Sequence, residues 1–344
     1  MEIFTSIELP LINVLIEMER FGIYLQSEKL SDISSRLRND LLKLEKDIYQ
    51  LADESFNIKS PKQLSYILYD KLGINIGSKK KTTRADLLES LKSDHPVVEK
   101  VLAYRALEKL RSTYTDALPK QINKKTNRIH CNFVQTATAT GRLACKDPNL
   151  QNIPIRSSIG KKIRCAFTPN EEDKVFLSAD YSQIELRLLA HLSQDPKLIN
   201  AFNIGEDIHT TTASEVFGVE KNNVTKEMRS NAKAVNFGIL YGQQAYGLSQ
   251  ELGIDIKKAS DFIKKYFEKY PGVQNYIQSS INNAHEFGYA KTMYGRQRPL
   301  PEINNKNNLI RAAAERLAIN TPLQGSQADI IKLAMIKIDQ FLEK

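Results

Sequence analysis

Hydrophobic residues recur at three- and four-residue steps over the first third of the chain, a spacing typical of helices that cover a core. The longest stripe comprises Leu30, Ile33, Leu37, Leu41, Leu44 and Ile48. We expect helical structure over residues 7–52, broken at Gly22, and another helix over residues 97–114. The lysine-rich segment 77–84 lies between these helices and is predicted to be a loop.

The pattern changes after Arg128 to one of short strands and turns. Residues 129–136 alternate between apolar and polar side chains, which predicts a strand. Residues 174–179 form a short apolar run of strand length, and a helix is expected over residues 182–193.

Helical periodicity returns at Glu206 and continues to the end of the chain, with interruptions at Pro271 and over residues 293–301. The last helix is expected to begin near Ser326 and has no glycine cap after it. A mostly helical chain with a few short strands belongs to the α+β class.

The charge of the chain narrows the kinds of partner that fit it. The formal net charge is +9, which suits a polyanion such as nucleic acid, although an unspecialised basic protein would look the same. Cys131, Cys145 and Cys165 are too few for a disulfide framework and form no CxxC pair. No apolar run has the length of a membrane span and no signal-peptide pattern begins the chain, so we expect a cytoplasmic protein with no membrane partner.

Four residues at equal spacing form a cationic and aromatic ladder: Arg229, Lys233, Phe237 and Tyr241. On a helix, four-residue steps drift by only about 40° each, so all four side chains share one broad face. The cations suit a triphosphate, and the rings suit a sugar and a base. The plainer alternative places both rings in the core and leaves two solvated cations.

An acidic residue follows the apolar run 174–179. Asp180 would lie at the end of a buried strand, where a carboxylate can bind Mg²⁺ together with the carbonyl oxygen of Tyr181. A lone aspartate at this point is more often a turn or cap residue, and Glu185 is by itself an ordinary helix-surface residue.

The surrounding motifs resemble those of family A DNA polymerases of the bacterial type. The similar segments are residues 136–156 (TATATGRLACKDPNLQNIPIR), 177–187 (LSADYSQIELR) and 229–242 (RSNAKAVNFGILYG). The resemblance implies a right-hand polymerase with thumb, fingers and an incomplete antiparallel-sheet palm. It assigns residues 1–127 to the thumb and palm-entry helices, 128–205 to the palm, 206–300 to the fingers and 301–344 to a palm helix.

The resemblance also implies roles for residues around a nucleotide and its metal ions. Asp180 and Tyr181 would bind one of two Mg²⁺ ions, and Lys233 would bind triphosphate and donate a proton to pyrophosphate. Glu185 would block a ribose 2′ hydroxyl, and Phe237 and Tyr241 would contact the nucleotide and the new base pair. The implied dNTP-binding residues are Gln183, Glu185, His209, Arg229, Lys233, Phe237 and Tyr241.

Further residues are expected to bind primer-template DNA. The resemblance places Arg142 and Gln151 near the primer end, Asn320 and Gln324 beside the terminal base pair, and Arg311 and Arg316 at the backbone. For Asn149 and Asn152, minor-groove contacts and local backbone caps remain equally good interpretations. The same holds for solvation or phosphate binding by the lysines at 79–81.

The third motif of the family, a strand with a His-Asp-Glu run, has no match here. The late aspartates Asp329 and Asp339 lie in a helical stretch instead. We therefore expect a palm that stops before its second catalytic aspartate, with synthesis strongly impaired in this chain. A second polypeptide carrying the missing palm segment, a catalytically inert DNA-binding remnant, and a single-subunit RNA polymerase are the alternatives.

Overall fold

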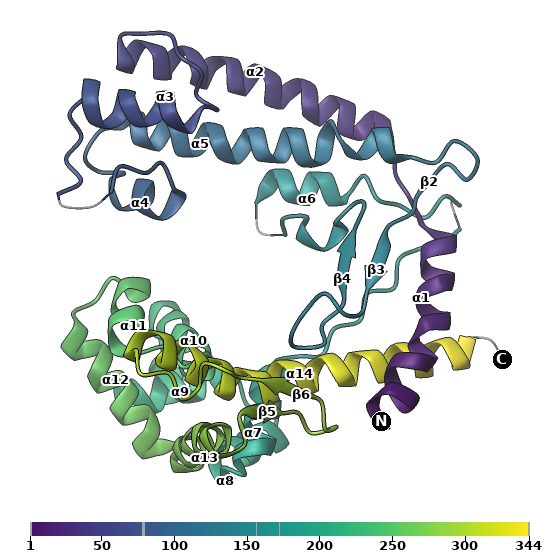
Figure 1. Cartoon of the computed structure of the whole chain (residues 1–344), viewed down its shortest axis with the longest axis vertical. Helices are drawn as coiled ribbons and strands as arrows, with labels where there is room; N and C mark the ends of the chain where they lie inside the picture. Colours follow the sequence, from purple (N-terminus) through teal and green to yellow (C-terminus); the bar gives the residue numbers. More distant parts are fainter. Residues whose placement is uncertain (1, 78–79, 156, 172, 343–344) are drawn as a thin grey trace. The chain divides into compact units, whose positions relative to one another are not determined.

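The computed structural model describes residues 2–77, 80–155, 157–171 and 173–342, and the chain divides into two compact units (Figure 1). The larger unit comprises Met1–Glu17, Phe133–Ala144 and Ser178–Lys344. The smaller unit comprises Met18–Asn132 and Cys145–Leu177. These boundaries cut across the expected thumb, palm and fingers, whose limits therefore stay a prediction.

The larger unit is built from helices around one main hydrophobic core. Its helices are α7 (Ile184–Ser193), α8 (Pro196–Asn203), α9 (Ile208–Phe217), α10 (Lys226–Leu240), α11 (Ala245–Leu252), α12 (Ile256–Lys269) and α13 (Pro271–Phe287), with the short turn η6 (Lys221–Asn223). Helix α10 packs against α9, and α7 packs against α13. Leu186, Leu189, Val235, Ile239 and Tyr266 are among the buried residues of the core.

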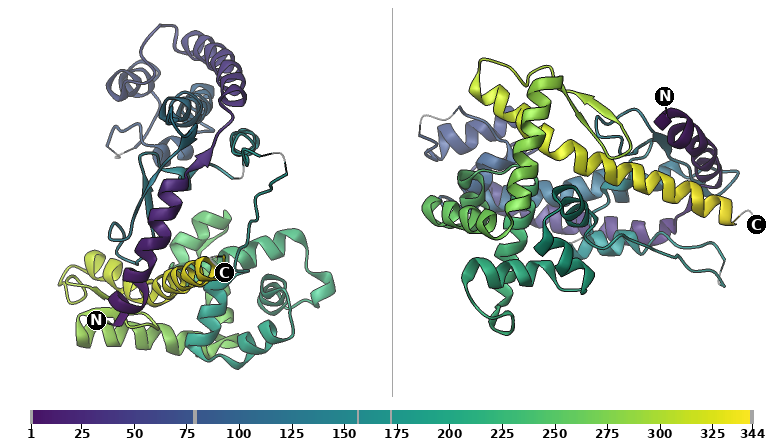
Figure 2. Two further views of the ribbon diagram at one scale, coloured as in Figure 1. Left: turned by 90° about the vertical axis from the view of Figure 1, so that its right-hand side faces the viewer. Right: turned by 90° about the horizontal axis from the view of Figure 1, so that it is seen from below.

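Helix α14 (Asn308–Leu342) runs through the larger unit, and Figure 2 shows it as one continuous helix. The expected start near Ser326 was wrong, because Pro322 lies inside the helix instead of before it. Proline removes one backbone donor, but packing on both sides preserves the helix: Ala318 and Leu323 are fully buried. Tertiary contacts thus outweigh the local propensity.

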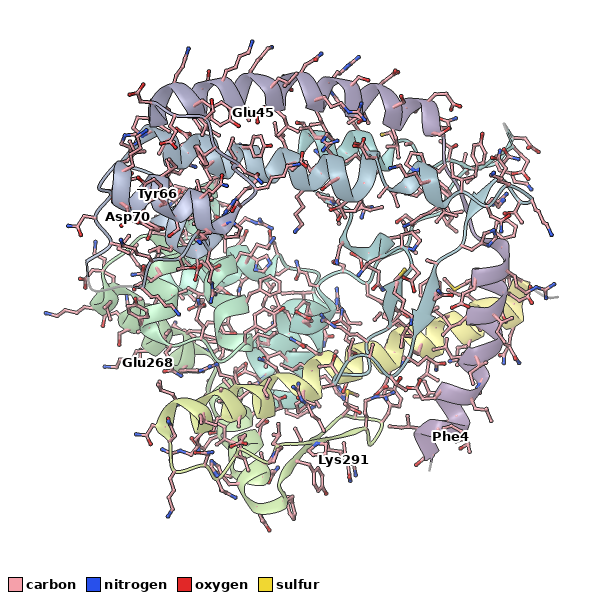
Figure 3. The ribbon with its side chains drawn as sticks, turned by 45° about the horizontal axis from the view of Figure 1, so that its top comes forward. Phe4, Glu45, Tyr66, Asp70, Glu268 and Lys291 are labelled. Atoms are coloured by element: carbon pink, nitrogen blue, oxygen red, sulfur yellow. The ribbon has the colours of Figure 1, made fainter. Side chains whose placement is uncertain are left out.

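The N-terminal segment packs against the C-terminal part of α14. It consists of the π-helical turn η1 (Phe4–Glu8) and α1 (Leu9–Phe21), which continues into the smaller unit. Leu11 and Leu15 of α1 share a buried cluster with Ile336 of α14. Phe4, labelled in Figure 3, is 59% exposed.

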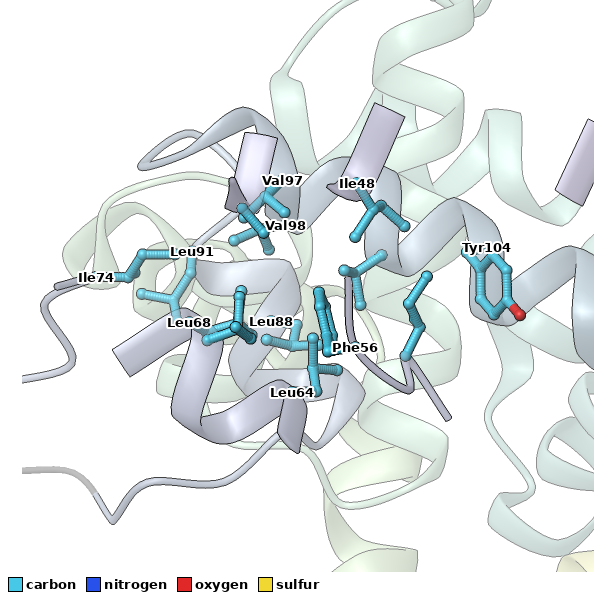
Figure 4. Close-up of a cluster of buried hydrophobic side chains, with 14 of the residues drawn as sticks. Ile48, Phe56, Leu64, Leu68, Ile74, Leu88, Leu91, Val97, Val98 and Tyr104 are labelled. Atoms are coloured by element: carbon cyan, nitrogen blue, oxygen red, sulfur yellow. The ribbon is translucent and has the colours of Figure 1, made fainter. Parts of the chain in front are cut away.

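The smaller unit contains the long amphipathic helix that the sequence predicts. Its helices are α2 (Ser27–Ala52), α3 (Pro61–Ser65), α4 (Ala85–Ser90), α5 (Pro96–Leu110) and α6 (Ser158–Arg164), with the turns η2 (Tyr66–Lys71), η3 (Arg111–Thr115), η4 (Leu118–Gln121) and η5 (Leu150–Asn152). Helices α2 and α5 pack against each other. Ile48, Leu64, Leu88 and Val98 meet in the core shown in Figure 4.

The strands of the described residues are short and form three two-stranded ladders. Their bounds are β1 (Ile23–Tyr24), β2 (Arg128–Ile129), β3 (Asn132–Val134), β4 (Ala144–Lys146), β5 (Tyr289–Lys291) and β6 (Gln297–Pro299). Strand β1 pairs antiparallel with β2, β3 pairs with β4, and β5 pairs antiparallel with β6. The prediction of an α+β, mostly helical chain is therefore confirmed.

The predicted strand at residues 174–179 is absent. This segment has no regular secondary structure and is unpaired within the described residues, and Val175 and Leu177 are 87% and 95% exposed. A strand needs a neighbouring strand for its backbone hydrogen bonds, and none of those described runs beside it. Asp180 therefore follows an exposed segment and not the buried strand that we expected. No helix among the described residues is long and apolar enough to cross a membrane.

Candidate functional site

The cationic and aromatic ladder lies on α10, as its spacing predicts. Thr225 caps the helix by accepting a hydrogen bond from the Met228 amide, and Tyr241 is the residue at its C-terminal cap. The Phe237 and Tyr241 rings are stacked, with centroids 6.3 Å apart and planes inclined by 23°. Lys233 is exposed, and neither ring is fully buried. The alternative in which both rings serve only as core residues does not describe this helix.

Asp207 joins the first cation of the ladder to the neighbouring helix. Its Oδ1 caps α9 by accepting from the amides of His209 and Thr210, and its Oδ2 accepts from Nε of Arg229 at 2.7 Å. Burial alone would raise the pKa of Asp207, but the hydrogen bond from Arg229 and those from the backbone outweigh it and lower the pKa. The guanidinium of Arg229 is thus held while its side chain stays 45% exposed.

His209 is buried beside the ladder and is 3% exposed. The amide nitrogen of Asn236 lies 3.1 Å from its Nδ1, and because an amide nitrogen only donates, the neutral ring carries its proton on Nε2. Burial lowers the pKa of His209, and the positive charges of Arg229 and Lys233 lower it further, against the opposing effect of Asp207. His209 is therefore a neutral hydrogen-bond donor near the two cations.

Glu185 joins three segments of the larger unit. Its Oε1 accepts from Nη2 of Arg142 and its Oε2 accepts from the Tyr241 hydroxyl, each at 2.8 Å. Burial and the bond to Glu185 raise the pKa of Tyr241 to about 12. Arg142 also donates to Oε1 of Gln327 on α14 at 2.9 Å, and its side chain remains 46% exposed.

The first half of α14 passes beside the end of α10. Asn320 donates from its side chain to the carbonyl oxygen of Tyr241 at 3.5 Å. Gly242 has a φ of +65° and lies against Arg316, whose Cγ would be 3.1 Å from a Cβ at that position. Arg316 is exposed, and Gln324 is partly buried one turn after Asn320. Near the start of the helix, Arg311 donates to the side chain of Asn308 at 2.7 Å.

Asp180 and Tyr181 are exposed at the start of the turn into α7, and Gln183 occupies the N-terminal cap position of that helix in a left-handed conformation with a φ of +52°. Within the described part of the chain, the Asp180 carboxylate makes no hydrogen bond or ion pair, so its oxygens are available to a cation. The described residues contain no group of three His, Cys, Asp or Glu side chains placed to hold a metal.

One protein carboxylate fits a magnesium ion that takes its other ligands from water and phosphate. A centre with two metal ions needs a further free carboxylate, and the described residues fit it less well. The Glu185 carboxylate is already engaged by Arg142 and Tyr241. Asp329 is fully buried and accepts from Nε of Arg296 at 3.0 Å, so it is not free for a metal either.

Three other predicted DNA contacts lie in the smaller unit. Asn149 caps η5 by accepting from the Gln151 amide at 3.1 Å, which is the local backbone cap considered from sequence. The side chains of Gln151 and Asn152 are exposed. Lys80 and Lys81 are also exposed, and Lys81 is paired with Asp70, whereas Lys79 lies outside the described residues.

The residues that hold the site together were not among those predicted from the sequence. Asp207 had a usable signal, because an aspartate directly before a helix is a common cap. Asn236 and Gln327 had none, since an amide inside a helix has no distinctive pattern. Their partners, His209 and Arg142, come from segments far away in the chain.

Comparison with known proteins identifies the family. A model of DNA polymerase family A matches residues 27–344, so the chain belongs to that family. Family A polymerases are nucleotidyltransferases that use divalent metal ions.

Individual relatives cover the chain almost completely. It is 50% identical over 345 residues to a DNA polymerase I of Caldicellulosiruptor bescii and 48% identical over 339 residues to one of Geobacillus stearothermophilus. These matches include 99% and 98% of the chain, which spans 40% and 39% of the respective relatives.

A solved structure shows the same fold. The polymerase domain of Pol1 from M. smegmatis, in complex with DNA primer-template and dNTP, superposes with a TM-score of 0.90 at 42% identity. The match covers 98% of this chain and 60% of that one. The predicted fold of a family A polymerase domain is thereby confirmed.

Proposed function

We propose that the chain is part of an enzyme that adds dNTPs to a primer 3′ hydroxyl under the direction of a DNA template. The observation that carries this proposal is the double engagement of Glu185 by Arg142 and Tyr241. It joins the ladder to the expected primer contact at one carboxylate. Primer extension requires the incoming nucleotide and the primer end to be held together in a reactive geometry. The similarity to a polymerase solved with primer-template and dNTP supports the proposal.

In this proposal the ladder binds the incoming nucleotide from its phosphates to its base. Arg229, Lys233 and the Nε2 proton of His209 meet the triphosphate, and Lys233 donates a proton to the leaving pyrophosphate. Phe237 stacks on the nucleotide, and Tyr241 closes against the new base pair. Asp207 contributes to nucleotide binding by holding the Arg229 guanidinium at the N-terminal end of the ladder face of α10.

Discrimination against ribonucleotides is assigned to Glu185. A carboxylate held from two sides has little freedom to move away from an added 2′ hydroxyl, and its side chain is only 12% exposed. Gln183, two residues earlier and partly buried, would complete the sugar side of the site. Deoxynucleotides are therefore the proposed substrates, which argues against the RNA polymerase alternative.

Mg²⁺ is the proposed cofactor, held through Asp180 and the backbone carbonyl of Tyr181. The ion would neutralise charge on the phosphates and bring the triphosphate to the carboxylate. The second ion of a two-metal centre needs another carboxylate, and in the 177–187 motif Asp180 is exposed and unengaged whereas Glu185 is held by Arg142 and Tyr241.

Primer-template DNA is the proposed macromolecular partner. Arg142, Arg311 and Arg316 supply positive charge, and Asn320 and Gln324 supply amides for the terminal base pair. Asn149, Gln151 and Asn152 of the smaller unit remain proposed DNA contacts. The thumb, palm and fingers limits stated from sequence remain the proposed domain assignment, and a cytoplasmic location accords with the bacterial relatives.

A further protein segment is also proposed as a partner. Apolar side chains are exposed on one end of the larger unit: Phe4 at 59%, Leu9 at 49%, Ile16 at 45% and Ile338 at 57%. Apolar surface of this kind usually contacts protein. A palm segment, on this or another polypeptide, would cover it and supply the missing carboxylate.

Primer extension with Mg²⁺ and all four dNTPs tests the proposal. We expect a polypeptide of these 344 residues to bind primer-template and the correct dNTP but to extend the primer poorly, because two-metal catalysis needs both carboxylates. Robust, Asp180-dependent extension would overturn the expected impairment. Failure to bind primer-template would overturn the function itself. Binding without any preference for the templated dNTP would favour an inert DNA-binding protein.

A further inference from the structure

Four charged side chains form a network inside the larger unit, away from the ladder. Lys332 donates to Oε1 of Glu8 at 2.7 Å, and Arg296 pairs with the same carboxylate. Arg296 also donates to Oδ1 of Asp329 through Nε at 3.0 Å and Nη2 at 2.6 Å. Asp329 is 0% and Lys332 is 1% exposed, so the network joins η1, the turn before β6, and α14 in the interior.

Stability alone does not account for such a network. Buried ion pairs lose their hydration, and apolar residues of similar size often stabilise a fold as well or better. The charges are nevertheless fully matched here: two acids face two bases, and Thr292 donates to the remaining oxygen of Asp329 at 3.0 Å. A network with this geometry holds its members, Arg296 among them, in one arrangement.

Arg296 lies directly on Gly141, the residue before Arg142. A Cβ at Gly141 would be 2.6 Å from Nε of Arg296, and the φ of Gly141 is +81°, a conformation that favours glycine. On its other side, the turn approaches α14: a Cβ at Gly325 would be 3.3 Å from the carbonyl oxygen of Thr140. Within the turn, Thr138 donates to the carbonyl oxygen of Arg142 at 2.7 Å.

The same helix that anchors Arg296 also receives Arg142. Gln327 accepts from Arg142 and lies two positions before Asp329 on α14. We propose that Arg296 and Asp329 are positioning residues for Arg142, because they clamp the 138–142 turn against α14 and so aim the Arg142 guanidinium at Glu185. The consequence for DNA binding rests on the function proposed above, whereas the clamp itself does not.

Limited trypsin digestion of the chain tests the clamp without DNA. The product that ends at Arg142 is measured by intact-mass spectrometry. Asp329→Asn should accelerate this cleavage roughly fivefold, within the usual range of couplings between contacting residues. Asp195→Asn is the matched control, because Asp195 is also 0% exposed but binds the amides of Leu198 and Gly272 instead. Equal acceleration by both variants, or none by Asp329→Asn, would overturn the proposal.

A double-mutant cycle tests the consequence for DNA, with binding of a fluorescent primer-template as the readout. Asp329→Asn should weaken binding roughly fivefold in the unmodified chain but less than about twofold when Arg142→Ala is already present. Equal losses in both backgrounds would show a general structural role and overturn the proposal. If Asp329→Asn does not fold, Arg296→Lys takes its place, since lysine keeps the charge but lacks the planar fork.

The two readouts separate the possible failures. A chain that does not bind primer-template contradicts the proposed function, and the trypsin result then still decides whether the clamp exists. A chain that binds DNA but shows no change at Arg142 contradicts the clamp and leaves the proposed function intact.

Discussion

Tyr241 donates a 2.8 Å hydrogen bond to Glu185, and this bond connects the C-terminal end of α10 with the first turn of α7. The carboxylate is also held by Arg142, so removing its charge affects three segments at once. An incoming nucleotide that reaches the rings of α10 would have to pass or replace this bond. Glu185 is therefore the residue at which sugar selection can be tested.

Glu185→Ala should weaken discrimination between dNTPs and rNTPs. We expect the unmodified chain to bind the templated dNTP at least roughly tenfold more tightly than the matching rNTP. In the variant the two affinities should differ by less than about threefold, because the group that opposes the 2′ hydroxyl is gone. Nucleotide titrations of a primer-template complex give both affinities. Glu227→Ala, in the first turn of α10, is the control and should keep the original ratio. An unchanged ratio in Glu185→Ala would refute the assignment.

Acid should destabilise the chain partly through His209. Its pKa is lowered in the folded state, so the unfolded chain binds its proton more readily. The stabilising contribution is complete above the ordinary pKa of about 6.5 and is lost as the pH falls from there towards the folded pKa. Thermal unfolding between pH 8 and pH 5 should therefore show a smaller loss for His209→Gln than for the unmodified chain. The exposed His191 gives the control His191→Gln, which should follow the unmodified chain; if His209→Gln follows it as well, the prediction fails.

Asp207 and Arg229 form one ion pair, but we expect their substitution to have different effects: mainly on stability for Asp207 and mainly on dNTP binding for Arg229. Asp207→Ala removes the cap of α9 and should lower the free energy of unfolding by about 1 kcal/mol. Arg229→Ala breaks an exposed pair and should change it by less than about 1 kcal/mol, while weakening dNTP binding roughly tenfold through the lost triphosphate contact. Denaturant unfolding and nucleotide titration measure the two effects. Lys226→Ala on the same helix is the control, and an equal loss of nucleotide affinity there would mean that general charge, not the ladder, attracts the nucleotide.

The buried network makes a prediction about stability. Lys332→Ala leaves the Glu8 carboxylate without one of its two cations and should lower the free energy of unfolding by about 3 kcal/mol. Lys337→Ala removes an exposed charge from the same helix and should change it by less than about 0.5 kcal/mol. Similar urea midpoints for the two variants would show that the network does not contribute to the fold.

Local patterns in the sequence predicted the helices that are set by the spacing of neighbouring residues. The four-residue spacing of Arg229 to Tyr241 placed a ladder on α10, and the apolar stripe from Leu30 to Ile48 predicted α2. Residues 174–179 have strand composition, but no strand in the described part of the chain pairs with them, and pairing is a property of two segments. The last helix was predicted to begin near Ser326, but it begins at Asn308 and continues through Pro322.

The contacts that complete the site were also beyond the sequence. Gln327 with Arg142, Asn236 with His209, and Asp329 with Arg296 join positions that only the folded chain brings together. The family motifs identify the residues that are expected to touch a nucleotide. They contain no information about which neighbours hold these residues in place.

A ternary-complex titration decides whether these residues form the nucleotide half of a polymerase site. The chain is bound to a primer-template whose primer lacks a 3′ hydroxyl, and each of the four dNTPs is added with Mg²⁺ while DNA dissociation is followed. We predict that only the templated dNTP stabilises the complex, by roughly tenfold or more, and that Lys233→Ala and Asp180→Ala each abolish this gain while the exposed control Asp173→Ala keeps it. Equal stabilisation by all four nucleotides, or a gain that survives in both variants, would contradict the account.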